Sequence, residues 1–500
     1  MRSQAEHRKV AQRFFLLRRC EEPWSVRPQQ LRIWEMPVRS LCTTAKNRTA
    51  AIQAVGCPVE FPSGHRLKAE EREERQAGGR RLEAGGRKAL PLRDILRIGC
   101  GVCWFALATI ADADGLGPIG GALGETKPIV DARLRYENVE QVGVPRDADA
   151  VTLRARLGFE TGKAWETALL VEGEFVTPLD SNYNSTVNGK TQYATVADPE
   201  NYELNRLQLT NTSLPQTTIT LGRQRVNLDD QRFVGNAGWR QNEQTFDALR
   251  VVNRTLTNVT VDVTYLNQVN RVFGKDSPQG AYQGDNLLAN LAYQTSIGKI
   301  TGFGYLLKFD PIPGVPAAIR DSSATYGTRF SGERPLSRIK LGYVVSYAHQ
   351  EDRGANPIKF GDDYYLAELT ATYRQFNIGA GWEILDGDGT KGFTTPLATL
   401  HKFQGWADKF LTTPPNGIDD RYVNAGFLMK GVGPFDTVSA TASYHDFHSQ
   451  RLWLKYGNEV NLQLQAKWHR FLGTLKYADY NAEGFATDTT KYWAQIEFAW

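Results

Sequence analysis

Arginine recurs at every second position in two segments of the chain, as Arg133 with Arg135 and as Arg154 with Arg156. A guanidinium group stays charged at physiological pH and binds a carboxylate in a two-pronged geometry. Several such groups along one wall make weak sites in series, which an acidic solute can enter and leave. The alternation places these arginines on one polar face, which makes them candidates for the lining of a solute pathway.

Three further arginines extend this candidate pathway. Arg206 lies in a segment with the same alternation, and the motif "GRQR" (222–225) adds Arg223 and Arg225. The last two have the parity of the apolar residues Ile219 and Leu221. They reach the polar face only if a β-bulge shifts the register. Any water-facing wall also carries Arg for solubility, so the cluster is more informative than each member.

The segment 227–243, "NLDDQRFVGNAGWRQNE", follows directly and is too long for a hairpin turn. We expect it to fold inward and constrict the pathway; the alternative is a loop over the rim. Its charged residues are Asp229, Asp230, Arg232, Arg240 and Glu243. A second long segment, 387–419, has apolar residues at near-helical spacing in "LATLHKFQGWADKF", which predicts a short helix or plug.

No catalytic motif is found. The stretch "YHDFHSQ" offers His445, His448 and Ser449, but on a strand end and its loop this spacing favours neither a triad nor a metal site. The stretch "DGDGT" (386–390) resembles half of a calcium loop without the distal Glu. We predict a protein that is not an enzyme and has no cofactor or metal, with a loop-bound Ca²⁺ as the alternative.

The elements that carry these residues have a period of two. In "VTLRARLGFE" (151–160) apolar residues alternate with Thr, Arg and Glu, and "NVTVDVTYL" (258–266) alternates in the same way. Successive side chains on a β-strand point to opposite faces, so each segment is a strand with one apolar and one charged face. The pattern predicts eighteen strands between residues 127 and 500, joined by long and short connections in turn.

A soluble β-sandwich would bury one face of each sheet, and the charged residues of these strands could not all be dried out. In a water-filled barrel they stay hydrated while the apolar face meets lipid. Alternating long and short connections are typical of an outer-membrane barrel with turns in the periplasm and loops outside. The charged residues in question are Asp131, Arg133, Arg135, Glu137, Arg154, Arg156, Glu172 and Glu174.

The front of the chain differs from the rest. Residues 1–113 hold 21 Lys and Arg against 12 Asp and Glu, whereas 114–500 hold 38 against 43. The basic balance therefore belongs to the front end and predicts no nucleic-acid binding by the main domain. All five cysteines precede residue 104, and a body without cysteine suits an oxidising compartment.

We expect four parts along the chain. Residues 90–113 have the basic flank, short apolar core and small residues of a secretory signal. Residues 1–89 are charged and glycine-rich, which predicts a disordered extension or an incorrectly assigned translation start. Residues 114–126 form a short periplasmic lead-in, and 127–500 form the barrel in the bacterial outer membrane. The final strand ends on aromatic Trp500, as an assembly signal of such barrels does.

The sequence resembles the alginate-export family of outer-membrane porins from about residue 123 to residue 500. The resemblance lies in "RLRYENV" (133–139), "LGRQRVNLDDQRFVGNAGWRQNEQTFDALRV" (221–251) and "PLATLHKFQGWADKFLTTPPNGIDDRYV" (396–423). It implies a monomeric barrel of eighteen strands whose arginine-rich lumen passes an anionic polysaccharide, an alginate-like polyuronate, by passive selective diffusion.

Other outcomes stay open at this level. A barrel of the same fold could take up another small acidic solute, or it could be a plugged structural barrel at the cell surface. The expected partners are the anionic poly- or oligosaccharide, outer-membrane lipid, the barrel-assembly machinery and, for export, a periplasmic secretion complex.

Overall fold

The computed structural model describes residues 117–500. The predicted extension (1–89), the signal (90–113) and the first residues of the lead-in lie outside this range, and these remain predictions. Within the described range a short helix, α2 (Pro118–Gly124), precedes the first strand. From residue 117 onward, no helix is both long and apolar enough to span a bilayer.

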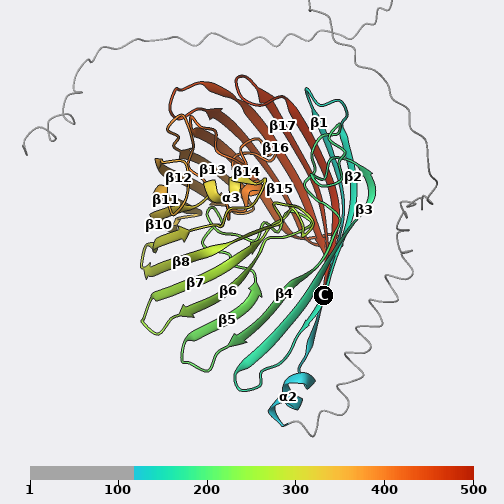
Figure 1. Ribbon diagram of the computed structural model, residues 1–500, viewed down its shortest axis with the longest axis vertical. Helices are drawn as coiled ribbons and strands as arrows, with labels where there is room; N and C mark the ends of the chain where they lie inside the picture. Colours follow the sequence, from blue (N-terminus) through green and yellow to red (C-terminus); the bar gives the residue numbers. More distant parts are fainter. Residues whose placement is uncertain (1–116) are drawn as a thin grey trace, which may run out of the picture. The chain divides into compact units, whose positions relative to one another are not determined.

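Residues 127–499 form a closed antiparallel β-barrel of eighteen strands (Figure 1), which confirms the predicted fold class and strand number. Each strand pairs with its neighbours in sequence, and β1 pairs with β18 from Asp131↔Ala499 to Gln141↔Thr489. That last pairing leaves no free sheet edge within residues 127–499. The strands are β1 (Lys127–Gln141), β2 (Ala148–Glu160), β3 (Thr167–Asn182), β4 (Asn201–Asn211), β5 (Thr217–Gln224), β6 (Thr245–Asn253), β7 (Val259–Asn270), β8 (Ala281–Thr295), β9 (Gly298–Leu307), β10 (Ser323–Leu336), β11 (Ile339–Asp352), β12 (Gly361–Tyr373), β13 (Phe376–Leu385), β14 (Ile418–Val432), β15 (Phe435–His448), β16 (Lys455–Trp468), β17 (Phe471–Ala482) and β18 (Thr489–Ala499).

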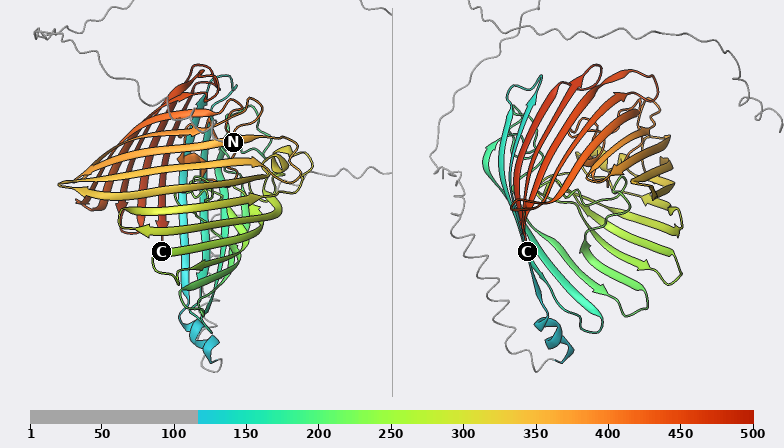
Figure 2. Two further views of the ribbon diagram at one scale, coloured as in Figure 1. Left: turned by 90° about the vertical axis from the view of Figure 1, so that its left-hand side faces the viewer. Right: turned by 180° about the vertical axis from the view of Figure 1, so that it is seen from behind.

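From β3 onward, long and short connections alternate around the barrel (Figure 2). Several turns have only two residues between strands, such as those at 337–338, 374–375 and 469–470. Each of these begins with a residue of positive φ, which matches the twist of the strands that it joins. By the rule for such barrels the turns face the periplasm and the long connections face the exterior. The longest are 225–244 and 386–417.

Inward and outward side chains follow the predicted alternation. On β1, Leu134 is 41% exposed and Tyr136 is 39% exposed on the outer face. The alternating residues Arg133 and Arg135 point inward and are buried. Large apolar side chains lie exposed on the outer face of nearly every strand. Near the turns the outer face carries aromatic residues such as Phe376, Trp468 and Phe471. An apolar belt edged by aromatic rings suits a bilayer.

The interior is not an open tube. A cluster of buried apolar side chains joins the inner face of the wall to the two longest connections. Phe233 packs against Phe303 and Tyr364 of the wall and against Phe393 of the second connection, with ring centres 5.1 to 6.1 Å apart. The connections therefore fold into the barrel and are held there by a hydrophobic core of their own.

Candidate functional site: the arginine wall and two inward loops

The first inward loop (residues 225–244) lies against the wall formed by β18, β1 and β2. Arg133 Nη1 donates hydrogen bonds to the backbone oxygens of Gly238 (3.2 Å) and Trp239 (3.0 Å). Its Nη2 pairs with Glu497 Oε2 at 3.1 Å. Register places these groups together, because Arg133 stands opposite Glu497 of β18 and opposite Arg154 of β2. Arg133 is thus both ion-paired and occupied by the loop tip.

Arg135 binds the same loop tip more closely. Its Nη2 donates to the backbone oxygen of Trp239 at 2.6 Å, and its Nε donates to Gln495 Oε1 at 2.9 Å. Its Nη1 lies 3.5 Å from Asp198 Oδ2, a residue of the loop between β3 and β4. Three elements therefore meet at one guanidinium group, which is completely buried.

Arg154 and Arg156 continue the wall on β2. Arg154 pairs with Asp131 of β1, and Arg156 Nε lies 2.5 Å from Glu174 Oε2 of β3. Arg156 also reaches Glu243 of the first inward loop at 3.5 Å. The Nε and Nη1 groups of Arg154 are buried and lack a hydrogen-bond partner among the described residues.

Arg206 and Arg225 belong to a neighbouring ion-pair network. Arg206 Nη2 lies 2.6 Å from Glu172 Oε2, and Arg225 Nη2 lies 2.5 Å from Glu243 Oε1 and 3.4 Å from Glu172 Oε1. Arg206 reaches the lumen because a β-bulge follows Glu172 in its pairing with β4. Arg225 lies just beyond β5, where the chain turns inward.

Arg223 is not on the lumen face. It stands opposite Leu207 of β4, an exposed outward residue, and no bulge interrupts β5 between Leu221 and Arg223. The bulge that an inward Arg223 requires is therefore missing. Its guanidinium binds both carboxylate oxygens of Asp247 at 2.7 and 3.0 Å on the outer wall.

The charged residues of the first inward loop contact widely separated parts of the wall. Asp229 Oδ1 pairs with Lys299 of β9 at 2.9 Å, and Asp230 Oδ2 pairs with Arg329 of β10 at 3.0 Å. Arg232 Nε lies 2.7 Å from Glu383 of β13, and Arg240 Nη2 lies 2.7 Å from Asp408 of the other long connection. The loop crosses the lumen from β9 to β1 and is bound at both sides.

The second inward loop (residues 386–417) runs beside the first. Gly235 N donates to Leu397 O at 2.8 Å, and Thr399 N donates to Gln231 O at 3.1 Å. The only helical turn in the predicted stretch is a 3₁₀ turn of three residues, Leu400–Lys402, among the residues that the structure describes. Positive φ at Gln404 and Asp408 prevents a longer helix there. The stretch is an inward loop with one helical turn.

Lys476 of β17 joins the two loops to the wall. Its Nζ lies 4.1 Å from the ring centre of Trp239 and 3.8 Å from that of Trp406. It also donates to His401 Nε2 at 2.6 Å. His401 stacks on Trp239 with ring centres 4.8 Å apart. We call Lys476, Trp239, Trp406 and His401 the lysine clamp.

Sequence reasoning did not single out the lysine clamp. The alternation on β17 does place Lys476 inward, opposite inward Trp493 of β18, and that parity was a usable signal. Nothing in the sequence indicates that Trp239 and Trp406, which belong to different loops, approach the same ammonium group.

The charges and the burial around the two inward loops set the protonation states of Glu243 and His401. Burial alone would raise the pKa of Glu243, but the charges of Arg156 and Arg225 lower it to about 2. Burial lowers the pKa of His401 well below its ordinary value, so the imidazole is neutral at neutral pH. It can then accept from Lys476 at Nε2 and donate from Nδ1 to Asp408 Oδ1, 2.7 Å away.

The residues considered for catalysis have separate surroundings. His445 Nδ1 lies 3.0 Å from both oxygens of Asp420, His448 stacks on Trp453, and Ser449 Oγ accepts from the backbone of Leu454. In "DGDGT", Asp388 Oδ1 accepts from the backbone N–H groups of Thr390 and Lys391. Among residues 117–500, no three His, Cys, Asp or Glu side chains are grouped as around a metal ion.

Comparison with known proteins places the fold. No family model matches the chain, and no curated protein matches it. Solved structures do match the chain. Because their sequence identities to it are only 11–15%, these matches show the fold alone. They include Pseudomonas aeruginosa OccK5 (OpdH), with a TM-score of 0.57, 14% identity and 76% of this chain covered against 99% of that chain. The fold is the eighteen-stranded barrel of outer-membrane porins, which are channels rather than enzymes.

Two further matches have the same extent. Pseudomonas aeruginosa OpdK, crystallised with vanillate, has a TM-score of 0.57 and 12% identity over 75% of this chain and 99% of its own. Acinetobacter baumannii OccAB4 has a TM-score of 0.58 and 13% identity over 75% of this chain and 98% of its own.

Proposed function

We propose that this protein is an outer-membrane porin that passes small acidic solutes, uronate oligosaccharides in particular, by selective passive diffusion. The observation that carries this proposal is the contact of the first inward loop with Arg133 and Arg135 of the wall. The loop narrows the lumen where the arginines gather, so a solute must pass close to guanidinium groups.

Partly exposed guanidinium groups support an acidic solute. Arg206 and Arg225 stay partly exposed beside Glu172 and Glu243. A carboxylate accepts from two N–H groups of one guanidinium at once, whereas a neutral hydroxyl group accepts from one. The resemblance to the alginate-export family supports a uronate as the carboxylate. Vanillate, which is bound in OpdK, is also a carboxylate, so uptake of a small aromatic acid is the alternative cargo.

Single-channel recording tests the proposal. The protein is refolded, inserted into a planar bilayer, and recorded with mannuronate oligomers, vanillate or a neutral oligosaccharide of matched size on one side. We expect an anion-selective channel that mannuronate blocks transiently and the neutral sugar does not. Block by vanillate alone would move the proposal to small aromatic acids, and a pore indifferent to all three would overturn it.

A plugged structural barrel is the second candidate. The apolar core between the wall and the two inward loops favours it, because such packing resists displacement of the loops. A barrel that inserts into the bilayer but conducts no ions would support this candidate. If the barrel exports its solute, a periplasmic secretion complex is an expected partner. For both candidate functions, the barrel-assembly machinery is the expected partner during insertion into the outer membrane.

A further inference from the structure

The inward face of β14, β15 and β16 carries neutral polar side chains. Val423, Tyr444 and Leu464 are exposed on the outer face of these strands, so the alternate positions point into the lumen. The segments 422–428, 437–443 and 461–465 contain no charged residue. Their inward positions include six amide or hydroxyl side chains, which we call the neutral belt: Asn424, Ser439, Thr441, Ser443, Gln463 and Gln465.

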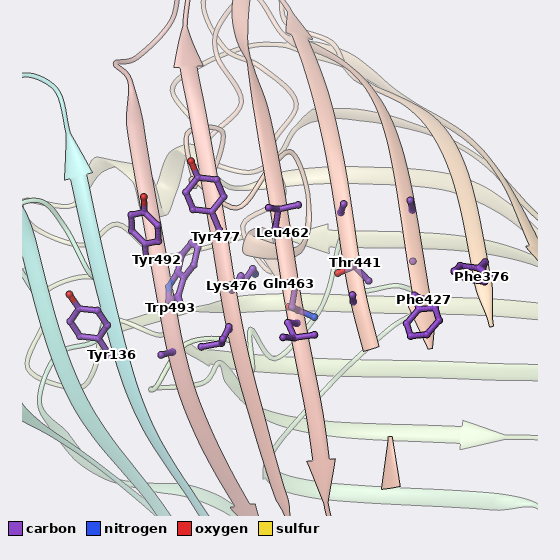
Figure 3. A pocket seen from close by; sticks show the side chains of 17 residues that line it. Tyr136, Phe376, Phe427, Thr441, Leu462, Gln463, Lys476, Tyr477, Tyr492 and Trp493 are labelled. Atoms are coloured by element: carbon purple, nitrogen blue, oxygen red, sulfur yellow. The ribbon is translucent and has the colours of Figure 1, made fainter. Parts of the chain in front are cut away.

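Strand pairing makes the neutral belt continuous. Asn424 of β14 stands opposite Ser443 of β15, and Thr441 of β15 stands opposite Gln463 of β16. Gln463 in turn stands opposite Lys476 of β17. Figure 3 shows Thr441, Gln463 and Lys476 in a row across these three neighbouring strands. The neutral belt therefore reaches the lysine clamp, where both inward loops meet the wall.

Most members of the neutral belt have unused hydrogen-bonding groups. Ser443 Oγ accepts from Asn461 Nδ2 at 3.3 Å, and Gln465 Nε2 donates to Thr474 Oγ1 at 3.2 Å. Within residues 117–500, the side chains of the other four members make no hydrogen bond. All six members are at least partly exposed. Their donors and acceptors are therefore open to a solute in the lumen.

The neutral belt begins where the second inward loop leaves the wall. On β16, Glu459 Oε1 accepts from the backbone N–H of Ala407 at 2.9 Å, and Asn461 Oδ1 accepts from that of Trp406 at 3.3 Å. Gln463 and Gln465 are the next inward positions towards the periplasmic turn at 469–470, and both are partly exposed. The neutral belt thus lines the lumen on the periplasmic side of the constriction.

A charged part of the wall lies across the lumen from the neutral belt. In the closed strand order, eight strands separate β5 from β14 in either direction, β6 to β13 one way and β15 through β18 and β1 to β4 the other way. Arg206 of β4 and Arg225, which follows β5, stay partly exposed. A solute between these two faces meets guanidinium groups on one side and neutral polar groups on the other.

The two faces have different hydrogen-bonding chemistry. Amide and hydroxyl groups both donate and accept hydrogen bonds, and so do the hydroxyl groups of a sugar, whereas a guanidinium only donates and a carboxylate only accepts. Each neutral hydrogen bond is weak enough to exchange with water, which lets a solute move on. Contact with water alone does not require neutral groups, because the inward face of β1 and β2 carries charges such as Asp131 and Arg154.

We propose that the neutral belt binds the hydroxyl groups of the solute and so selects hydroxylated acids over acids of equal charge without hydroxyl groups. This inference rests on the proposed porin function and adds to it the residues that recognise the uncharged part of the solute. Thr441 and Gln463 are the members to change, because they lie opposite each other on neighbouring strands and make no other side-chain hydrogen bond among the described residues.

Single-channel recording of the full chain in planar bilayers tests this inference with two probes of equal charge. One probe is a mannuronate trimer, and the other is an acrylate trimer, which has the same number of carboxylates but no hydroxyl group. We expect the wild type to be blocked for longer by the mannuronate trimer. Gln463→Leu and Thr441→Val should each shorten these blocks by about threefold to tenfold, the effect of one lost neutral hydrogen bond, and leave acrylate blocks unchanged.

The matched control is Gln375→Leu, in the exposed turn at 374–375, which should behave as the wild type does. Equal block times for the two trimers in the wild type, or unchanged mannuronate blocks in both variants, would overturn the role of the neutral belt and leave an acid-selective porin standing. Shorter blocks by both trimers would also overturn it, because they would indicate a changed pore shape. A channel that neither trimer blocks would contradict the proposed function and this inference together.

Discussion

The guanidinium carbon of Arg135 lies 4.1 Å from the ring centre of Trp239, and the same group donates a hydrogen bond to the backbone oxygen of Trp239. A residue of the arginine wall thus holds the tip of the first inward loop by two kinds of contact. A desolvated cation–π contact contributes about 2 kcal/mol. Arg135 therefore positions the tip of the first inward loop.

Replacing Trp239 should loosen the loop tip. Trp239→Ala removes the contacts with Arg135, His401 and Lys476 together. We expect larger and noisier single-channel conductance than in the wild type, measured in planar bilayers. Trp165→Ala, on an exposed periplasmic turn, should leave conductance unchanged. Identical traces for both variants would show that the loop tip does not limit the current.

The lysine clamp makes a separate prediction. Lys476→Met keeps the length of the side chain but removes its charge and its hydrogen bond to His401. We expect more frequent transitions between conductance levels, because both loops lose a shared contact. Lys467→Met, an exposed lysine near a periplasmic turn, is the control. Steady current in Lys476→Met would show that the apolar core alone holds the loops.

Arg232 should matter for stability. Arg232→Met leaves Glu383 buried without its partner at 2.7 Å, which costs about 3 kcal/mol or more. Unfolding by urea in lipid vesicles measures the loss. Lys340→Met, which breaks an exposed pair with Glu333, should change stability by less than about 1 kcal/mol. Adding Glu383→Gln to Arg232→Met should recover part of the loss, and no recovery would contradict the assigned pair.

The ion pairs of Glu243 with Arg156 and Arg225 should tolerate mild acid. The pKa of Glu243 is lowered to about 2 from an ordinary value of 4.5. A lowered carboxylate pKa stabilises the folded state fully above the ordinary value, and the contribution is lost as the pH falls towards the folded pKa. Urea unfolding in lipid vesicles, compared for the wild type and Glu243→Gln, should therefore show a stability difference that is constant above about pH 5 and is lost only as the pH falls towards about 2. A midpoint near pH 6 would implicate a different group.

Arg206 and Arg223 distinguish the two faces of the wall. Arg206→Gln removes a lumen charge and should shift the reversal potential towards cation selectivity, although one partly exposed pair is worth only about 0.2–1 kcal/mol. Arg223→Gln removes a charge from the outer wall and should leave the reversal potential unchanged. Equal shifts in both variants would contradict the outward placement of Arg223.

The sequence by itself determined the barrel. Side chains of a strand alternate strictly, so the parity of Arg133 against Leu134 predicted which face meets water and which meets lipid. The same periodicity predicted eighteen strands, the number that the barrel has. These features depend on short-range patterns, which a sequence displays directly.

Only the tertiary structure decided what each arginine meets. Arg133 and Glu497 are 364 positions apart and become neighbours because the barrel closes between β1 and β18. Arg223 lies outward because β5 continues without a bulge, and Trp239 reaches Lys476 because its loop crosses the lumen. Barrel closure and loop packing bring distant residues together, and no local period encodes those contacts.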